Sequence, residues 1–377
     1  MIFRLTRMDG RELLLIPGPV SVEPEVLEAL GMPVRAHYGE DWAADYALLT
    51  ENLRQIFRTR GDVFLLFGPG TAANEAALAS ALAPGDEVIV CSNGMFGERL
   101  RDLSVALGLQ VHLVTAEVGY PVLPELVEAA ISRHPAARLL AVVHHETSAG
   151  LLNPVHEICR LGRRHGLLTL VDAISSLGGV ELEMDDWGID ICSTVANKAL
   201  GGPIGIAPLA VGDRVWAAVE DGRPKRTGWY LNLSNWRDAP RTQSPIHPHP
   251  TTMPTNVIDA LAVAVKQILD SSLEERHRRC AGAADRVREG LGELGFSMVV
   301  EPPYASPLCT AVWSRPGMDV ARYQKWMRSE RGLRLGGGLG RLYGKSFRVG
   351  HMGRAAEPAV VDSFLNATSD YLALRTA

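Results

Sequence analysis

The sequence predicts an α/β fold, in which helices cover both faces of a mostly parallel central sheet and a smaller α+β domain follows. Two observations support this. Short apolar runs alternate with stretches of helical periodicity up to residue 211, and unbroken apolar strands separated by helices are typical of a parallel sheet buried on both faces. After residue 212 the alternation stops.

The strands are expected where apolar and β-branched residues run together between turn residues. Seven such runs lie before residue 212, at 62–67, 87–91, 111–114, 139–144, 167–172, 190–195 and 205–211. The spacing of apolar residues between them predicts helices, among them 72–82, 123–132 and 156–166.

The rest of the chain has a different pattern. Residues 221–256 are rich in Pro, Trp, Thr and His and are predicted to be irregular, and a loop this long usually carries function. A helical stretch follows over 256–294. Short strands are expected at 297–300, 309–313 and 346–350. We predict a large domain over 16–255 and a small domain that combines 256–377 with 1–15.

Composition excludes several classes of protein. The chain has 377 residues, of which 46% are hydrophobic and 21% charged, and a net charge of −5. This balance is typical of a globular enzyme and does not suggest a nucleic-acid or anionic-membrane partner. No apolar run approaches the roughly 20 residues of a membrane span. The five scattered cysteines argue against a disulfide framework and a zinc site, and we expect a cytoplasmic protein.

Lys198 stands in the stretch TVANKALGGP (194–203), after an apolar approach and before two glycines. Burying an unpaired ammonium is costly, so this setting favours a lysine whose amine has a lowered pKa and forms a Schiff base. The alternative is an ordinary exposed lysine in a loop.

Asp172 closes the apolar run 167–172. In parallel sheets, ligands bind beyond the carboxyl ends of strands. An acid there can keep the ring nitrogen of a cofactor protonated, so that the ring takes up electrons. The alternative is a helix cap, a role that Asp often fills.

Two further features suggest anion binding. The turn Gly68–Thr71 precedes a helix, and free amides at a helix N-terminus suit a phosphate; an ordinary turn with a threonine cap is the alternative. Arg348 lies on a short strand of otherwise small or apolar residues. Its guanidinium can bind a substrate α-carboxylate with two hydrogen bonds, and a structural salt bridge is the alternative.

The order and spacing of these features resemble the class V pyridoxal-phosphate aminotransferases of fold type I. The chain looks most like the alanine–glyoxylate, serine–pyruvate and pyridoxamine–pyruvate aminotransferases. The resemblance runs from IPGPV (16–20) to RVGHMG (348–353) and includes SNGMFGER (92–99), HHETSAG (144–150) and GGGLG (336–340). It implies pyridoxal 5′-phosphate as cofactor. It also implies ping-pong transfer of an amino group from a small amino acid to a small 2-oxo acid.

The resemblance also implies roles for individual residues. Lys198 forms the Schiff base and removes the α-proton, and Asp172 pairs with the ring nitrogen. Phe96 stacks on the ring, although from the sequence alone an aromatic there could equally be part of the core. Arg348 binds the substrate carboxylate. The remaining cofactor-binding positions are Pro69, Gly70, Thr71, Thr147 and Asn197.

Thr252 matches a threonine that reaches the phosphate of the neighbouring subunit, which implies a homodimer with shared active sites. His249 stands where some relatives have a tyrosine, and we assign it no role. His247 and His249 lack a third ligand at a recognisable spacing, so no metal site is expected. His145, at the end of a strand, is interpreted as a packed histidine whose hydrogen bonds are satisfied, and a contact with substrate or cofactor is the alternative.

Two alternative activities stay open. Pyridoxamine–pyruvate aminotransferases carry an acidic residue in the phosphate-loop region and an additional arginine, whereas this chain has GPGT (68–71) and Leu339 at those places, with Arg341 nearby. A lyase or desulfurase on the same fold needs a nucleophilic cysteine on a mobile loop, whereas Cys309 falls in a strand-like run. The sequence does not name the amino donor or the acceptor.

Overall fold

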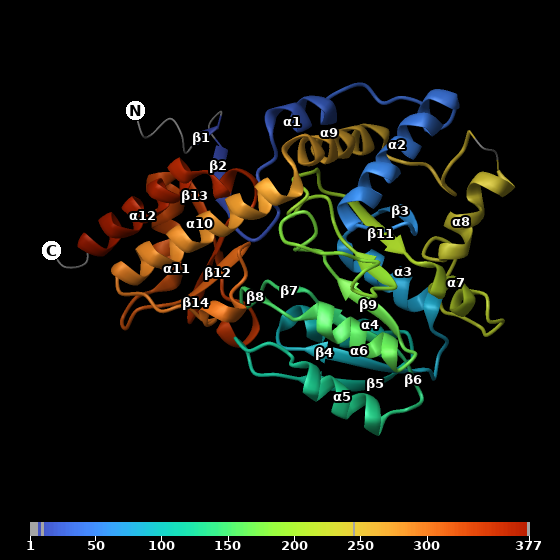
Figure 1. Ribbon diagram of the computed structural model, residues 1–377. Helices are drawn as coiled ribbons and strands as arrows, with labels where there is room; N and C mark the ends of the chain where they lie inside the picture. The colour runs from blue at the N-terminus through green and yellow to red at the C-terminus, as the bar shows by residue number, and fades with distance from the viewer. Residues whose placement is uncertain (1–6, 9–10, 244–245, 375–377) are drawn as a thin grey trace.

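The computed structural model describes residues 7–8, 11–243 and 246–374. Two large sheets organise the chain, one of seven strands and one of five, with a two-stranded sheet of β7 (His145–Glu146) and β8 (Leu151–Leu152). Figure 1 shows the seven-stranded sheet among its helices on one side of the molecule. Helices α10 (Leu273–Glu293), α11 (Val320–Arg331) and α12 (Pro358–Ala373) lie on the other side, with the five-stranded sheet (Figure 1).

The seven-stranded sheet contains all seven runs that the sequence predicts to be strands. Their spatial order is β3 (Asp62–Phe67), β11 (Ile206–Val211), β10 (Ile191–Ser193), β9 (Leu168–Asp172), β6 (Ala137–Val143), β4 (Glu87–Ser92) and β5 (Gln110–Thr115). Only β11 runs antiparallel to its neighbours. The carboxyl ends of β4, β6, β9 and β10 therefore meet at one edge of the sheet.

Helices follow most of these strands, as the alternating pattern predicts. They are α3 (Gly70–Ala81), α4 (Met95–Ala106), α5 (Pro124–Arg133), α6 (Val155–Arg164) and α7 (Asp213–Val219), while α2 (Glu40–Phe57) precedes β3. The buried face of α3 consists largely of alanines, so its backbone lies close to β10 and β11. This close packing fixes the helix N-terminus at the carboxyl edge of the sheet.

The prediction that 221–256 is irregular is wrong at its centre, where α8 (Leu233–Thr242) forms. The Asn232 side chain accepts a hydrogen bond from the Ser234 amide at 3.1 Å, so it caps the helix. Leu233, Trp236 and Ala239 are buried along one face. This short apolar face is difficult to recognise in the sequence, because the segment contains Pro240 and many polar residues.

The helical stretch 256–294 is two helices, α9 (Thr255–Ser271) and α10 (Leu273–Glu293). Ser272 separates them with a φ of 62°, and its hydroxyl accepts a hydrogen bond from the Glu275 amide. The strand expected at 297–300 is also wrong, because Met298 forms only an isolated bridge with Val312. Near the start of the chain, α1 (Pro24–Leu30) packs on α9.

The five-stranded sheet has the order β1 (Arg7–Met8), β2 (Arg11–Leu15), β13 (Leu333–Gly337), β14 (Ser346–Gly350) and β12 (Cys309–Trp313). The strands predicted at 309–313 and 346–350 are confirmed. Helices α10, α11 (Val320–Arg331) and α12 (Pro358–Ala373) supply side chains to its core. Short 3₁₀ turns occur at Pro302–Tyr304, Gly340–Leu342 and Gly353–Ala356. Residues 11–15 thus join this sheet, while the predicted domain boundaries stay a prediction.

All five cysteines are buried and unpaired. Within the part of the chain that the structure describes, no helix combines the length and the apolar character needed to cross a membrane.

Candidate active site

Lys198 lies just beyond the carboxyl end of β10. Its Nζ donates a hydrogen bond to the Pro17 carbonyl oxygen at 2.9 Å. Burial, together with the positive charge of Arg348, lowers the pKa of Lys198 to about 8, while the charge of Asp172 acts in the opposite direction. The structure therefore contradicts the alternative of an ordinary exposed loop lysine.

The segment Pro17–Pro19 covers the Lys198 side chain. Gly18 has a φ of +117°, and a Cβ built on it would lie 2.1 Å from Lys198 Cδ. Only glycine permits this backbone conformation and this approach together. The covering segment and the buried amine thus form one unit.

Asp172 ends β9 and is buried. Its Oδ2 accepts a hydrogen bond from Asn74 Nδ2 at 2.8 Å, and its Oδ1 accepts one from the Ile174 amide at 3.0 Å. Ser193 Oγ donates to Asn74 Oδ1 at 2.5 Å. Burial raises the pKa of Asp172, and the bonds from Ile174 and Asn74 oppose that rise. Sequence reasoning missed Asn74 and Ser193, although Asn74 lies one helical turn after Gly70.

The turn before α3 brings the predicted phosphate-binding residues to the same edge of the sheet. Gly70 is the first helical residue, and no side chain caps α3. A Cβ on Gly70 would lie 2.6 Å from Ile174 Cδ1, so the turn lies directly against the residues that follow Asp172. Pro69 is exposed and Thr71 is partly buried. An uncapped helix N-terminus is a suitable place for a phosphate.

Arg348 lies on β14 opposite Gly336 of β13. Its Nε donates to the Gly337 carbonyl at 2.8 Å, and its Nη1 donates to the Thr147 carbonyl at 3.0 Å. The side chain is buried, and among the described residues no carboxylate pairs with it. The alternative of a structural salt bridge is therefore wrong within this part of the chain. A buried cation without a carboxylate in direct contact suits an anionic ligand.

Phe96, Thr147 and Asn197 also lie around this edge. Phe96 is in the first turn of α4, where the guanidinium carbon of Arg99 lies 5.1 Å from its ring centre. Thr147 is buried and contacts Arg348 through its carbonyl. Asn197 precedes Lys198, and its carbonyl oxygen accepts a hydrogen bond from the Val20 amide.

Thr252 lies outside the central sheet, on the segment between α8 and α9, and its side chain is exposed. Within the described residues, no hydrogen bond joins Thr252 to Lys198.

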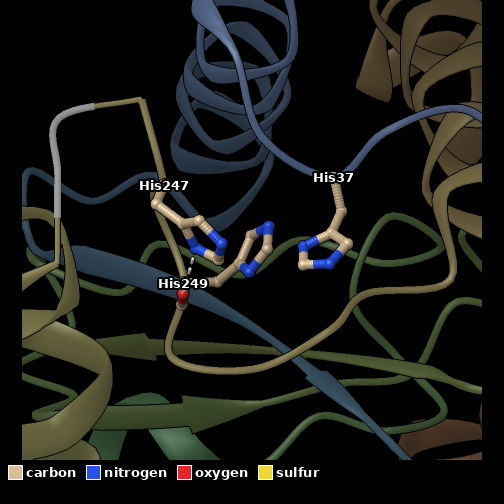
Figure 2. Close-up of side chains that lie close together, drawn as sticks. All are labelled: His37, His247 and His249. Atoms are coloured by element: carbon tan, nitrogen blue, oxygen red, sulfur yellow. Dashed lines mark hydrogen bonds between the residues drawn. The ribbon is translucent and has the colours of Figure 1, made fainter.

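Three histidines form a cluster that sequence reasoning missed, because His37 lies far from His247 and His249 in the chain (Figure 2). One ligand atom of each lies within 4.8 Å of the others. However, His249 Nδ1 donates to the Thr251 carbonyl at 2.7 Å, and its Nε2 accepts from Trp42 Nε1 at 2.9 Å. Both ring nitrogens of His249 are therefore already used, which does not favour metal binding.

His145 is buried and Nδ1 bonds the Ser175 carbonyl at 3.3 Å, while its Nε2 has no partner among the described residues. His145 is packed, as interpreted from the sequence, but only one of its two ring nitrogens has a hydrogen-bond partner among the described residues. Burial lowers the pKa of His145 to about 3, and the nearby Lys198 ammonium acts in the same direction. The imidazole is neutral at physiological pH.

Comparisons with known proteins identify the family of the chain. Residues 31–310 match the family Aminotransferase class-V. The chain is 32% identical over 353 residues to an uncharacterized aminotransferase of Methanocaldococcus jannaschii, covering 93% of this chain and 90% of the relative. It is 31% identical over 358 residues to the pyridoxamine–pyruvate transaminase of Mesorhizobium japonicum, covering 94% and 90%.

A solved structure gives the same answer for the fold. The alanine–glyoxylate aminotransferase from Nostoc sp. superposes with a TM-score of 0.92 at 32% identity, covering 96% of this chain and 95% of that one. The mixed α/β architecture is that of the fold type I aminotransferases. The resemblance seen in the sequence is confirmed. The chain belongs to the class V aminotransferases, which are enzymes that depend on pyridoxal phosphate.

Proposed function

We propose that this enzyme transfers the amino group of a small amino acid, of the alanine or serine type, to a small 2-oxo acid such as glyoxylate or pyruvate. The proposal depends mainly on the interaction between two basic side chains, those of Lys198 and Arg348. The Lys198 amine has a pKa lowered to about 8, and Arg348 lacks a carboxylate partner among the described residues and acts on that amine. A substrate that brings its own carboxylate satisfies Arg348 beside the base.

The residues present fit pyridoxal phosphate. The set combines a primary amine of lowered pKa, a buried carboxylate held by Asn74, and an uncapped helix N-terminus at Gly70. In this proposal Lys198 holds the aldehyde carbon, Asp172 pairs with the ring nitrogen, and Phe96 stacks on the ring. The amides at Gly70 and Thr71, with Pro69 shaping the turn, hold the phosphate. When bound, pyridoxal phosphate supplies an electron sink for the electron pair left when the substrate Cα–H bond breaks.

Lys198 also moves the proton. Its neutral Nζ takes the proton from the substrate Cα and returns it on the other side of the transferred nitrogen. Arg348 orients the substrate through its carboxylate, which places the Cα–H bond near Nζ. The carbonyl bonds from Arg348 to Gly337 and Thr147 hold the guanidinium in place without neutralising it.

We also propose that Thr252 and Asn197 complete the cofactor site, with Thr252 serving the neighbouring subunit of a homodimer. In support, Thr252 is exposed in the single chain, and large apolar side chains such as Tyr38, Phe67 and Ile204 are exposed too. The free, buried cysteines are consistent with a cytoplasmic location.

Transamination of free pyridoxamine with pyruvate is the second candidate, because a relative and a structural neighbour carry that name. Leu339 and the acid-free loop at 68–71 count against it. A desulfurase is less well supported, because Cys309 is buried in β12 and burial raises its pKa to about 11.

The visible absorption of the purified enzyme tests the proposal. After addition of pyridoxal phosphate, we expect a cofactor band that L-alanine removes and glyoxylate restores. A protein that turns over only free pyridoxamine with pyruvate would support the second candidate. A protein with no band and no turnover of any amine would overturn both.

A further inference from the structure

Helix α4 lacks a cap of its own at the end where Phe96 lies. Its N-cap residue is Gly94, which offers no side chain to the exposed amides of the first turn. Such amides need acceptors when they are buried. The acceptors come from a distant part of the chain, the turn that follows β6.

Glu146 supplies most of them. Its Oε2 accepts hydrogen bonds from the Phe96 amide at 2.9 Å and from the Gly97 amide at 3.1 Å. Its Oε1 accepts from the amide and the hydroxyl of Ser148, at 3.1 and 2.6 Å. The Ser148 hydroxyl in turn accepts from the Met95 amide at 3.2 Å. Glu146 and Ser148 together therefore bond the first three amides of α4.

Glu146 is a costly residue to place here. Its side chain is fully buried, and among the described residues no Lys or Arg forms an ion pair with it. Burial raises its pKa, and the four donors oppose that rise. A neutral Ser or Asn at position 94 would cap the helix without burying a charge. A Cβ at Gly94, however, would lie 2.5 Å from Glu146 Cδ, so the backbone of the turn rests on the carboxylate.

The next residue along the chain links this cap to the five-stranded sheet. The Thr147 carbonyl accepts the 3.0 Å hydrogen bond from Arg348 Nη1. The turn is held from both sides, because the Gly150 amide bonds the Glu146 carbonyl and the Ser306 amide bonds the Gly150 carbonyl. Residues 146–148 thus join Phe96 of α4 to Arg348 of β14.

We propose that Glu146 is a positioning residue that fixes Phe96 and Arg348 relative to each other. The cofactor ring and the substrate carboxylate then keep a fixed relative position. The inference rests on the proposed roles of Phe96 and Arg348. Glu146 touches neither ligand. It acts through the backbone of α4 on one side and through Thr147 on the other.

The test compares Glu146→Gln with Glu98→Gln, a matched change at an exposed residue in the same first turn. Glutamine keeps the size of Glu146 but directs a donor at groups that are themselves donors. In the cofactor-free protein we expect hydrogen exchange of the Phe96 and Gly97 amides to rise at least about tenfold in Glu146→Gln. With pyridoxal phosphate, we expect the KM for L-alanine to rise about tenfold while kcat falls less. Glu98→Gln should change neither.

Two results would overturn the proposal. One is unchanged exchange at Phe96 and Gly97 in Glu146→Gln. The other is faster exchange with unchanged cofactor affinity and KM, which would make Glu146 a helix cap only. If Glu146→Gln does not fold, Ser148→Ala decides, because it removes one donor to Oε1 and the acceptor of the Met95 amide but leaves both bonds to Oε2. A smaller KM increase supports the proposal, and an unchanged KM overturns it.

The exchange measurement separates this proposal from the proposed function. A wild-type protein that binds no pyridoxal phosphate would overturn the function. Exchange at Phe96 would still show by itself whether Glu146 fixes α4.

Discussion

Asn74 and Asp172 lie 98 residues apart in the chain, and a buried hydrogen bond of 2.8 Å joins the amide of one to the carboxylate of the other. The Oδ1 atom of Asn74 accepts a hydrogen bond from the Ser193 hydroxyl. Three elements, α3, β9 and β10, therefore fix the orientation of one carboxylate.

Replacing Asn74 with Ala should weaken cofactor binding. The loss of its hydrogen bond raises the pKa of Asp172 further and leaves the Ser193 hydroxyl without its acceptor. We expect the dissociation constant for pyridoxal phosphate to rise about tenfold, which corresponds to about 1.4 kcal/mol. Titration followed by visible absorption measures this. Asn366→Ala, at an exposed position of α12, is the control, and equal affinities in both variants would contradict the prediction.

Replacing Lys198 with Ala should abolish transamination. The substitution removes the proposed base, and loss of a general base costs roughly 10²–10⁴-fold in rate. The visible band of the bound cofactor should change as well, since the amine that holds it is gone. Steady-state assays with Lys266→Ala, whose ammonium is exposed on α9, provide the comparison. Full activity in Lys198→Ala would disprove its assignment.

Replacing Arg348 with Gln should raise the KM for the amino donor by about 100-fold, because a buried charge-assisted pair is lost. Lys at this position should not restore the KM, because it lacks the planar fork. The pH profile should move as well. Burial is the main cause of the lowered pKa of Lys198, about 8, and the charge of Arg348 adds to it. Removal of Arg348 therefore raises that pKa, and the rising limb of kcat/KM shifts to higher pH. An unshifted limb, or an equal KM change in the exposed control Arg322→Gln, would contradict this.

Replacing Gly18 with Ala should impair the site more than the fold. The new Cβ would collide with the Lys198 side chain, and the positive φ adds backbone strain. Gly222→Ala is the matched control, because Gly222 also has a positive φ, of +76°, but has nothing within 4 Å of a Cβ. We expect both variants to lose similar thermal stability and only Gly18→Ala to lose cofactor binding. Equal cofactor affinity in the two would refute the prediction.

Stability should fall at acid pH because of buried neutral histidines. Burial lowers the pKa of His351 to about 3 and that of His144 to about 4, below the unfolded value near 6.5. The unfolded chain therefore takes up protons first as pH falls, so the stabilisation is complete above about 6.5 and is lost toward 3. Each such histidine costs about 2 kcal/mol of unfolding free energy at pH 5. Urea unfolding at pH 7.5 and 5 measures the loss, and His351→Gln should lose less than wild type. The same loss in both would argue against this cause.

The strands and four features of the site could be predicted because each is local in the chain. An apolar run ending in Asp172, or a lysine before two glycines, carries its meaning within about ten residues. Glu146, Asn74 and His37 could not be found in this way. Glu146 matters through Phe96, 50 residues away, and Asn74 through Asp172, 98 residues away. No spacing rule links such pairs before the fold is known.

The misplaced elements have equally physical reasons. Helix α8 is short and contains Pro240, so its three buried residues do not stand out from a polar segment. The break between α9 and α10 is a single residue, Ser272, whose positive φ is uncommon for a serine. The expected strand at 297–300 has the right residue types but lacks a partner strand that pairs along it.

The pairing of β2 with β13 sets an order on folding. Leu13 lies beside Leu333, whereas every strand of the seven-stranded sheet falls between residues 62 and 211. During synthesis the seven-stranded sheet can form before β2 is able to pair with β13, which is made some 320 residues later. The loop that Pro17 and Gly18 form over Lys198 follows β2 directly. The segment that covers the Lys198 amine can therefore be fixed in place only late in chain synthesis. A chain truncated before β13 should leave Lys198 exposed to water.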